Sequence, residues 1–239
     1  MAGTVGENLA AVMERIEKAA KRAGRDPGEI TLVVATKSRE PREIRRAIAA
    51  GARVFGENYV QEAQEKIPKI RRSSVRWHLI GHLQKNKVKF AVELFDMIES
   101  VDSAGLAKEI NKRAKAPMDV LIEVNLGGEA SKHGVHPSEA VELAREIASF
   151  ENLRLRGLMA IPPQPEDPEM SRPYFVTLRR IAERINREKI PGVVLKDLSM
   201  GMSADFEVAI EEGATIVRIG TAIFGERPPK GGSASRGRA

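Results

Sequence analysis

The 239-residue chain contains no cysteine, few aromatic side chains and no long apolar run. The absence of cysteine excludes disulfides, thiolate metal sites and cysteine nucleophiles, so any metal would need His, Asp or Glu ligands. Aromatic residues make up 4% of the chain, with one Trp and two Tyr, which leaves few rings for stacking on nucleic acid bases. We therefore expect no nucleic acid partner.

Membrane-targeting patterns are also missing. No stretch of about eighteen apolar residues is present, and the first ten residues lack the basic and apolar regions of a signal peptide. We therefore expect a cytoplasmic protein that does not span a membrane.

The formal net charge is +6, from 39 Lys and Arg residues against 33 Asp and Glu residues. Part of this excess lies in residues 226–239, which contain four basic residues and one acid among Pro, Gly and Ser. We predict that this segment is a disordered basic tail. The remaining charge suits a small anionic ligand but is too low for a nucleic acid surface.

Short β-branched runs alternate with helical stretches along most of the chain. The predicted strands lie at residues 30–36, 53–55, 76–80, 97–100, 120–124, 155–159, 195–199 and 216–219. The predicted helices lie at about residues 41–50, 58–70, 84–92, 103–115, 137–149, 170–188 and 204–212. This alternation favours an α/β fold, a (β/α)₈ TIM barrel, over an open doubly wound sheet. An amphipathic pattern over residues 5–22 predicts an extra N-terminal helix that plugs or flanks the barrel, and we expect one domain over residues 1–225.

One lysine stands at the carboxyl end of the first predicted strand. The segment TLVVATK ends on Lys37, and in a barrel this end of each strand faces the active site. A lysine that is partly removed from water at such a place can act as a Schiff-base amine. The alternative is that the strand simply ends there and the side chain extends into solvent.

The last two predicted strands are followed by small and hydroxyl-bearing residues. IVRIGTAIFG is a buried strand with Arg218, followed by Gly220 and Thr221 at the start of a short helix, and LSMGMSA supplies Ser199 and Ser203. Barrel phosphate sites commonly use the loops after strands seven and eight. Together the two loops predict a site for one phosphate group, next to Lys37 because strands one and eight adjoin in a closed barrel.

The histidines and the long loops are less specific. His78 and His82 are four residues apart, but His78 belongs to a predicted strand and Gly81 would break a helix, so we expect no metal site. The loops at residues 126–136 and 161–173 would lie at the catalytic end of a barrel, either as functional loops or as solvated connectors.

A Schiff-base lysine beside a phosphate site is what pyridoxal 5′-phosphate (PLP) requires. The segments TLVVATKSRE, GENYVQEAQEK, WHLIGHLQKNK, LIEVNLGGEASKHG, LRGLMAI and DLSMGMSADFEVAIEEGATIVRIGTAIFG resemble the successive motifs of the PLP homeostasis (YggS/PROSC) family. The resemblance covers about residues 5–225. It implies a fold-type III PLP-binding barrel like the N-terminal domain of alanine racemase.

The resemblance also implies roles for individual residues. Lys37 would hold the cofactor as an internal aldimine, and the phosphate would be held by Ser203, Gly220 and Thr221, with Ser199 as a helper. Arg218 corresponds to the arginine that faces the pyridine nitrogen in the racemase barrels. Asn58 would lie near the cofactor ring and His82 at the barrel mouth.

Arg218 bears on the reaction that such a protein could support. A cation beside the pyridine nitrogen keeps that nitrogen unprotonated and weakens the ring as an electron sink. In addition, the basic tail follows the last predicted strand almost at once, so we expect no second domain to supply an opposed base. The prediction is a monomeric carrier that binds PLP and exchanges it with apo PLP-dependent enzymes, without turning over an amino acid.

Three alternatives remain open from the sequence. The chain could be a small PLP-dependent racemase or decarboxylase, or a barrel for another phosphorylated metabolite or RNA. Lys132 and His133, in the loop after the fifth predicted strand, could receive or release the cofactor by transimination at Lys132, or they could be solvated loop residues.

Overall fold

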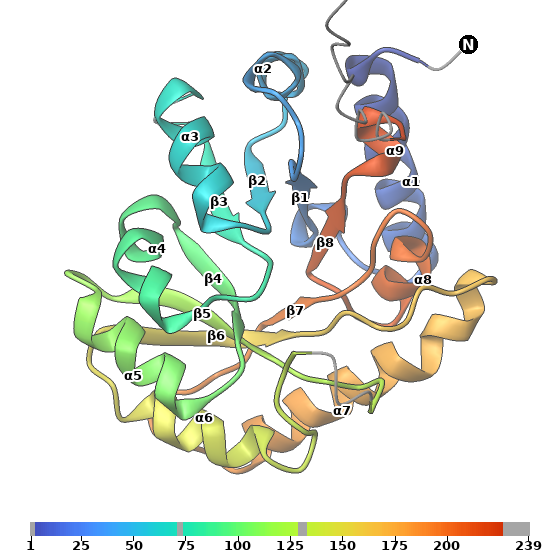
Figure 1. Cartoon of the computed structure of the whole chain (residues 1–239). Coiled ribbons are helices and arrows are strands. Elements are labelled where there is room, and N and C mark those ends of the chain that lie inside the picture. The colour runs from blue at the N-terminus through green and yellow to red at the C-terminus, as the bar shows by residue number, and fades with distance from the viewer. Residues whose placement is uncertain (1–2, 71–73, 129–132, 227–239) are drawn as a thin grey trace, which may run out of the picture.

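A computed structural model of the protein describes residues 3–70, 74–128 and 133–226. Within these residues, parallel strands form a closed barrel in the order β1-β2-β3-β4-β5-β6-β7-β8, and β8 pairs with β1 (Figure 1). The predicted TIM barrel is therefore confirmed. The strands are β1 (Thr31–Ala35), β2 (Val54–Glu57), β3 (Arg76–Leu79), β4 (Met97–Val101), β5 (Met118–Glu123), β6 (Leu153–Met159), β7 (Asp197–Ser199) and β8 (Ile216–Ile219).

Helices surround the strands on the outside of the barrel (Figure 1). They are α1 (Val5–Arg22), α2 (Pro41–Ala49), α3 (Val60–Ile70), α4 (Val88–Leu94), α5 (Ala104–Arg113), α6 (Ala140–Ala148), α7 (Arg172–Arg187), α8 (Phe206–Glu211) and α9 (Thr221–Phe224). Short 3₁₀ turns η1 (Pro27–Glu29), η2 (Lys85–Lys87) and η3 (Pro168–Ser171) lie between them. Among the described helices, none is long and apolar enough to cross a membrane.

The extra N-terminal helix flanks the barrel rather than plugging it. Helix α1 begins with a capping box in which Thr4 and Glu7 bond each other's backbone N–H groups, and it packs against α2, α8 and α9. Its apolar side, which includes Leu9, Val12 and Ile16, is buried in these contacts. The three- and four-residue spacing of apolar positions thus places one side of α1 on the outer helix layer.

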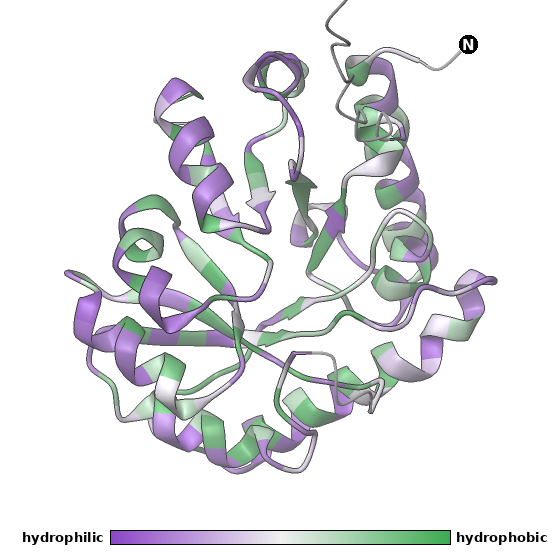
Figure 2. Cartoon of the chain, in the orientation of Figure 1, coloured by the Kyte–Doolittle hydropathy of each residue, from purple (hydrophilic) through white to green (hydrophobic). Residues whose placement is uncertain are grey.

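Apolar side chains form two layers, one inside the barrel and one between strands and helices. Apolar residues are frequent along the strands and alternate with polar residues along the helices (Figure 2). Successive residues of a strand point to opposite faces, so Val33 of β1 faces the interior while Val34 faces the helices. The interior layer comprises Val33, Ile80, Met97, Leu121, Met159 and Ile216. The outer layer is the larger of the two, and it anchors the helices that hold the strand ends in place.

The element boundaries differ from the predicted ones at several ends. The predicted helix at 84–92 begins as η2 and continues as α4 to Leu94, and the predicted strand at 195–199 is reduced to β7, which starts at Asp197. The predicted tail beyond residue 226 lies outside the described residues, as does Lys132. These differences leave the strand order and the direction of the strands unchanged.

Candidate functional site

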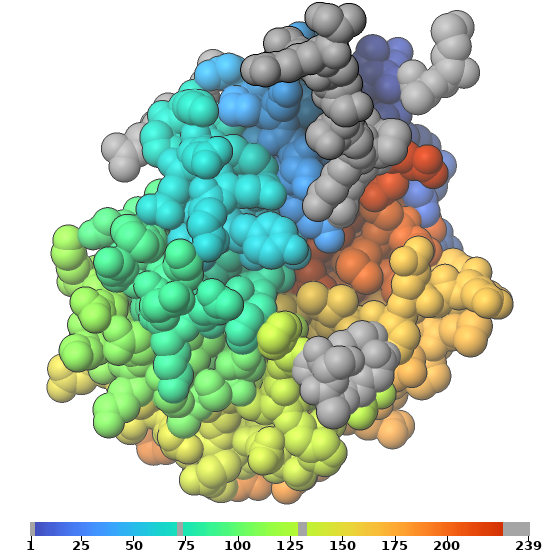
Figure 3. All heavy atoms as spheres, in the orientation of Figure 1, coloured from blue at the N-terminus to red at the C-terminus, as the bar shows by residue number. Residues whose placement is uncertain are grey.

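A cavity of about 370 Å³ lies at the carboxyl ends of β1, β7 and β8. Five residues that the sequence predicts for the site line it: Lys37, Ser203, Arg218, Gly220 and Thr221. On the face shown in Figure 3, residues of the first strands, of the last strands and of the segment after β6 meet near the centre. The loop after β6 contributes Gln164 and Pro165 to the lining, so this long loop does reach the site.

Lys37 lies just past the end of β1, in a turn. The strand ends at Ala35, and the N–H of Thr36 still donates to the carbonyl of Gly56 on β2, at 2.8 Å. Ser38, the next residue in the turn, has a φ of 61°. The strand therefore brings Lys37 to the barrel mouth, and the turn carries the chain away to α2. The Lys37 side chain is partly buried where it lines the cavity.

A buried ion pair, Lys66 with Glu57, is hydrogen-bonded to the backbone of this turn. Nζ of Lys66 on α3 donates to the carbonyl of Thr36 at 2.8 Å and to Oε1 of Glu57 at 2.9 Å. Glu57 is fully buried, and burial raises its pKa, while Lys66 and the Thr36 hydroxyl act in the opposite direction. The cluster joins β1, β2 and α3 directly beside Lys37, and it restrains the backbone from which Lys37 projects.

The turn after β8 packs closely against the end of β1. A Cβ on Gly220 would lie 3.1 Å from the carbonyl oxygen of Ala35, so a larger residue would push the two strand ends apart. The N–H of Ala222 points toward Oγ of Ser203, at 3.3 Å. This brings the backbone of the turn and the hydroxyls of Ser203 and Thr221 to one side of the cavity. Hydroxyl and amide donors in this arrangement suit a phosphate group.

Arg218 is held by a chain of buried polar groups that crosses the inside of the barrel. Its Nη1 donates to Oγ of Ser199 at 2.5 Å, and its Nη2 donates to the carbonyl of Ala160 at 2.8 Å. The Ser199 hydroxyl donates in turn to Oε2 of Glu99, at 2.5 Å, and Oε1 of Glu99 lies 2.6 Å from Nδ1 of His78. We call His78, Glu99, Ser199 and Arg218 the buried relay. Its members come from β3, β4, β7 and β8, so the guanidinium position depends on four strands.

The charges of the relay depend on each other. Burial alone would raise the pKa of Glu99, but its contacts with His78, Arg218 and Ser199 hold the pKa of this carboxyl below its usual value. Burial lowers the pKa of Arg218, and the carboxylates of Glu99, Glu123 and Asp205 oppose that shift. A buried charge is tolerated only when it is paired and hydrogen-bonded. Glu99 and Arg218 form such a pair, and the Ser199 hydroxyl is hydrogen-bonded to both.

A buried carboxylate, Asp205, also borders the cavity, and both of its oxygens are engaged. Oδ1 accepts the N–H of Met202 at 2.7 Å, and Oδ2 accepts the hydroxyl of Ser171 at 2.7 Å. Asp205 therefore holds the loop after β7 in shape. The cationic side chains Lys37, Arg39 and Arg218 all line the same cavity, which favours an anionic ligand.

Three predicted site residues do not line this cavity. The Ser199 hydroxyl is fully buried between Glu99 and Arg218, away from the turn that carries Thr221. Asn58, at the end of β2, has a buried Oδ1 with no hydrogen-bond partner among the described residues. His82 lies after β3, with its Nδ1 at 3.2 Å from Oδ2 of Asp102.

The chain is similar over almost its whole length to proteins of one family. The family model for the alanine racemase N-terminal domain matches residues 8–228. A pyridoxal phosphate homeostasis protein from Aquifex aeolicus is 49% identical over 224 residues, which cover 92% of this chain and 97% of that protein. The chain belongs to the pyridoxal phosphate homeostasis protein family.

Solved structures place the family within a wider set of barrels. PipY of Synechococcus elongatus, solved with PLP bound, superposes with a TM-score of 0.81 at 34% identity, covering 93% of this chain and 100% of PipY. Alanine racemase from Corynebacterium glutamicum superposes with a TM-score of 0.71 at 17% identity, covering 93% of this chain and 63% of the racemase. The second likeness shows a shared barrel fold and no more.

The sequence analysis missed several residues that shape the site. Glu99 and Glu123 each interrupt an apolar strand, in MIESV and LIEVN, and both are almost fully buried. An acid within an otherwise apolar run was the available signal, because a buried carboxylate needs a partner. Arg39 and Asp205 lie within motifs that were recognised, in TLVVATKSRE and DLSMGMSADFEV, but nothing in their spacing indicated that they line the cavity.

Proposed function

We propose that this protein binds PLP in the cavity at Lys37 and takes part in PLP homeostasis, with Lys37 as the lysine that forms the Schiff base and without amino-acid turnover. The observation that carries the proposal is the gathering of Lys37, Ser203, Arg218 and Thr221 around one cavity at the carboxyl ends of the strands. The relatives named as pyridoxal phosphate homeostasis proteins and the PLP-bound PipY structure support it.

The residues present fit the cofactor. Its phosphate is an anion, and the cavity is lined by cationic side chains together with the hydroxyl groups of Ser203 and Thr221. A Cβ on residue 220 would crowd the carbonyl oxygen of Ala35 at 3.1 Å, which favours glycine at the turn where a phosphate would approach the backbone. The buried Oδ1 of Asn58, at the end of β2, accepts no hydrogen bond from the described residues, and a polar group of the cofactor would satisfy it.

Each residue would contribute by binding or orienting. When bound, the cofactor supplies an aldehyde that condenses with a primary amine, and Lys37 brings such an amine to the cavity. Ser203 and Thr221 would donate hydrogen bonds to phosphate oxygens, and Gly220 would let the backbone approach them. Arg218, fixed by Ser199 and Ala160, would face the ring nitrogen and oppose its protonation because both would be positive. An unprotonated ring is a weak electron sink, which favours carriage of the cofactor over chemistry on an amino acid.

Several finer points remain predictions. Exchange of PLP with apo PLP-dependent enzymes, a monomeric state and a cytoplasmic location rest on the sequence analysis. Ser199, Asn58 and His82 likewise remain predicted contributors outside the lining of the cavity.

Borohydride trapping tests the site assignment. The wild-type protein incubated with PLP should show a visible absorption band, and reduction should leave one pyridoxyl group on Lys37, located by peptide mass spectrometry. Lys37→Ala should lose both the band and the adduct. Lys89→Ala is the matched control, because Lys89 is exposed on α4, and it should keep both. An adduct at wild-type stoichiometry on another lysine of Lys37→Ala would contradict the assignment.

Exchange of the α-hydrogen tests the absence of turnover. The PLP-loaded protein is incubated with each amino acid in deuterated water, and α-deuterium is measured by mass spectrometry. We expect no incorporation above the level given by free PLP. Incorporation at enzymatic rates in the wild type and not in Lys37→Ala would instead favour the racemase or decarboxylase alternative.

A further inference from the structure

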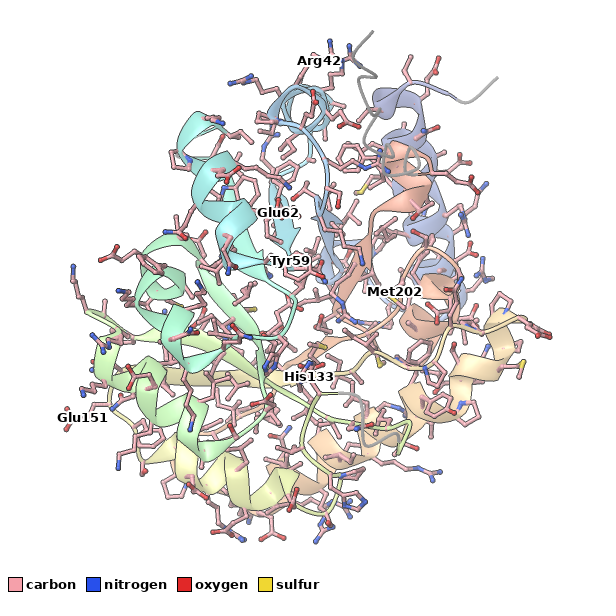
Figure 4. All side chains as sticks on the ribbon, in the orientation of Figure 1. Arg42, Tyr59, Glu62, His133, Glu151 and Met202 are labelled. Carbon is pink, nitrogen blue, oxygen red and sulfur yellow. The ribbon has the colours of Figure 1, made fainter. Side chains whose placement is uncertain are left out.

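A second group of ligating side chains lies at the barrel mouth, at the ends of β3, β4 and β5. We propose that His82, Asp102 and His133 form a binding site for one divalent transition-metal ion, with Zn²⁺ as the expected ion. None of these three residues lines the cavity that contains Lys37, so the metal ion and the cofactor phosphate would be held by different residues. In Figure 4, His133 lies near the centre of the view, apart from Met202 of the cavity lining.

The three side chains lie close enough to share an ion once the imidazoles turn toward it. One ligand atom from each lies within 4.8 Å of the other two. The rings of His82 and His133 are stacked, with centroids 3.6 Å apart and planes 8° from parallel. Two donors on a tetrahedral zinc ion, at 2.0–2.1 Å from it, are about 3.4 Å apart. In this stacked arrangement the nitrogen lone pairs, which lie in the ring planes, do not converge on one point. At least one imidazole must therefore turn out of the stack and bring its nitrogen roughly an ångström closer to the other ligands, and both rings are exposed at the surface, where they can turn.

The backbone beneath each ligand is well fixed. His82 follows Gly81, whose carbonyl accepts the Ser100 hydroxyl at 2.7 Å. Asp102 follows β4, and the Ser103 hydroxyl bonds its Oδ1 at 3.0 Å, which leaves Oδ2 facing His82. A hydrogen bond of this kind orients a carboxylate ligand and is typical of metal sites.

His133 is brought back to the mouth by the chain that follows it. The next residue, Gly134, has a φ of 105°, and a Cβ there would lie 2.7 Å from the backbone N of Asn125. Val135 then bonds the carbonyl of Glu123 through its N–H, at 2.8 Å. This bridge ties the segment to the end of β5, so His133 meets His82 and Asp102 although it comes from a separate loop.

The donor set selects the class of ion. Two imidazoles and one carboxylate suit zinc and its neighbours in the transition series, whereas magnesium and calcium prefer oxygen ligands alone. Three protein ligands leave a position for water or an anion, as in an open zinc site. The pair that the sequence analysis considered, His78 with His82, is a different one: His78 is buried in the barrel against Glu99.

Calorimetry with histidine variants tests the site. Untagged full-length protein is titrated with Zn²⁺, and we expect one ion per chain. His82→Ala and His133→Ala should each bind at least about 100-fold more weakly, and Asp102→Asn about 10-fold more weakly. His136→Ala is the matched control, because His136 is an exposed histidine of the same loop whose ring hydrogen-bonds Ser138, and it should bind as the wild type does.

Two further measurements make the result decisive. Co²⁺ should give visible ligand-field absorption in the wild type and His136→Ala but not in His82→Ala, and circular dichroism should show that all variants remain folded. Lys37→Ala should bind Zn²⁺ as tightly as the wild type, which separates this site from the proposed PLP site. Wild-type affinity in both His82→Ala and His133→Ala would overturn the proposal, since the ion would then be held elsewhere. A wild-type dissociation constant weaker than about 100 μM would also overturn it, and the three residues would then form only a surface contact between loops.

Discussion

The two halves of the barrel mouth are built on different strands of one parallel barrel, yet they suit ligands of opposite charge. The half at β7, β8 and β1 presents Lys37, Arg218 and hydroxyl groups around a cavity that suits an anion. The half at β3, β4 and β5 presents the imidazoles of His82 and His133 with the carboxylate of Asp102, a donor set that suits a cation. The barrel fixes where side chains converge, and the residues just past each strand decide which ligand can bind there.

The buried relay connects these halves through the inside of the barrel. Glu99 lies on β4, under the imidazole half, but its Oε2 lies 3.9 Å from Nη1 of Arg218, which serves the other half. His78 on β3 contacts the same carboxylate. The cation at the PLP half is thus stabilised by an anion from the opposite strands, so the halves share their electrostatics although they differ in ligand.

The largest effect is expected from placing a negative charge in the anion half alone. Thr221→Asp would put a carboxylate beside the proposed phosphate position, and repulsion should weaken PLP binding by about 1000-fold or more, roughly 4 kcal/mol. Fluorescence or absorbance titration with PLP measures the change. Thr221→Asn, of the same size and neutral, is the control and should bind far more tightly than Thr221→Asp. Equal affinities of the two variants would mean that the phosphate lies elsewhere, while Zn²⁺ binding should be unchanged in both.

The next effect comes from breaking the connection between the halves. Glu99→Gln keeps the shape of the side chain but leaves the Arg218 cation without its buried counter-charge, which should lower the free energy of unfolding by about 3–4 kcal/mol. Denaturant unfolding measures this loss. Glu93→Gln is the control, because Glu93 is largely exposed on α4 beside Lys115, and it should change stability little. A loss below about 1 kcal/mol in Glu99→Gln would show that Arg218 does not depend on Glu99.

The two halves also differ in how well the sequence predicts them. The anion half is encoded in continuous segments: TLVVATK ends on Lys37, and IVRIGTAIFG contains Arg218, Gly220 and Thr221 in order. Once the alternation of strands and helices predicts a closed barrel, strands one and eight must adjoin, so these segments meet. Their local patterns are sufficient because each carries its strand and its turn together.

The imidazole half could not be predicted in the same way. His82, Asp102 and His133 lie in three separate loops, and their convergence depends on the barrel register and on the return of the chain at Gly134. The relay is equally non-local, since Ser199 was predicted at the phosphate but its hydroxyl bonds Glu99 and Arg218. Spacing along the chain reports turns and strand faces, but it does not report which side chains meet across a barrel.

The smallest effect concerns Glu123, at the border between the halves. Burial raises the pKa of Glu123 to about 7, with Arg218 opposing the shift and Asp102 adding to it. The folded protein therefore keeps a proton on this carboxyl that the unfolded chain releases near pH 4.5. The contribution of Glu123 to the free energy of unfolding is fully present below about pH 4.5. It is lost as the pH rises through about 7, by roughly 3 kcal/mol in total.

Glu123→Gln should remove this pH dependence, because an amide keeps the neutral form at every pH. In chelator-containing buffer, the unfolding free energy of the variant minus that of the wild type should grow between pH 4.5 and pH 8 by roughly 3 kcal/mol. Glu151→Gln is the control, since Glu151 is exposed at the edge of the molecule, far from the mouth (Figure 4), and its profile should follow the wild type. Parallel profiles for Glu123→Gln and the wild type would mean that the border carboxylate is already ionised in the folded protein. In that case the attraction of the Arg218 cation would outweigh the burial of Glu123, and Arg218 would stabilise a negative charge at the end of β5.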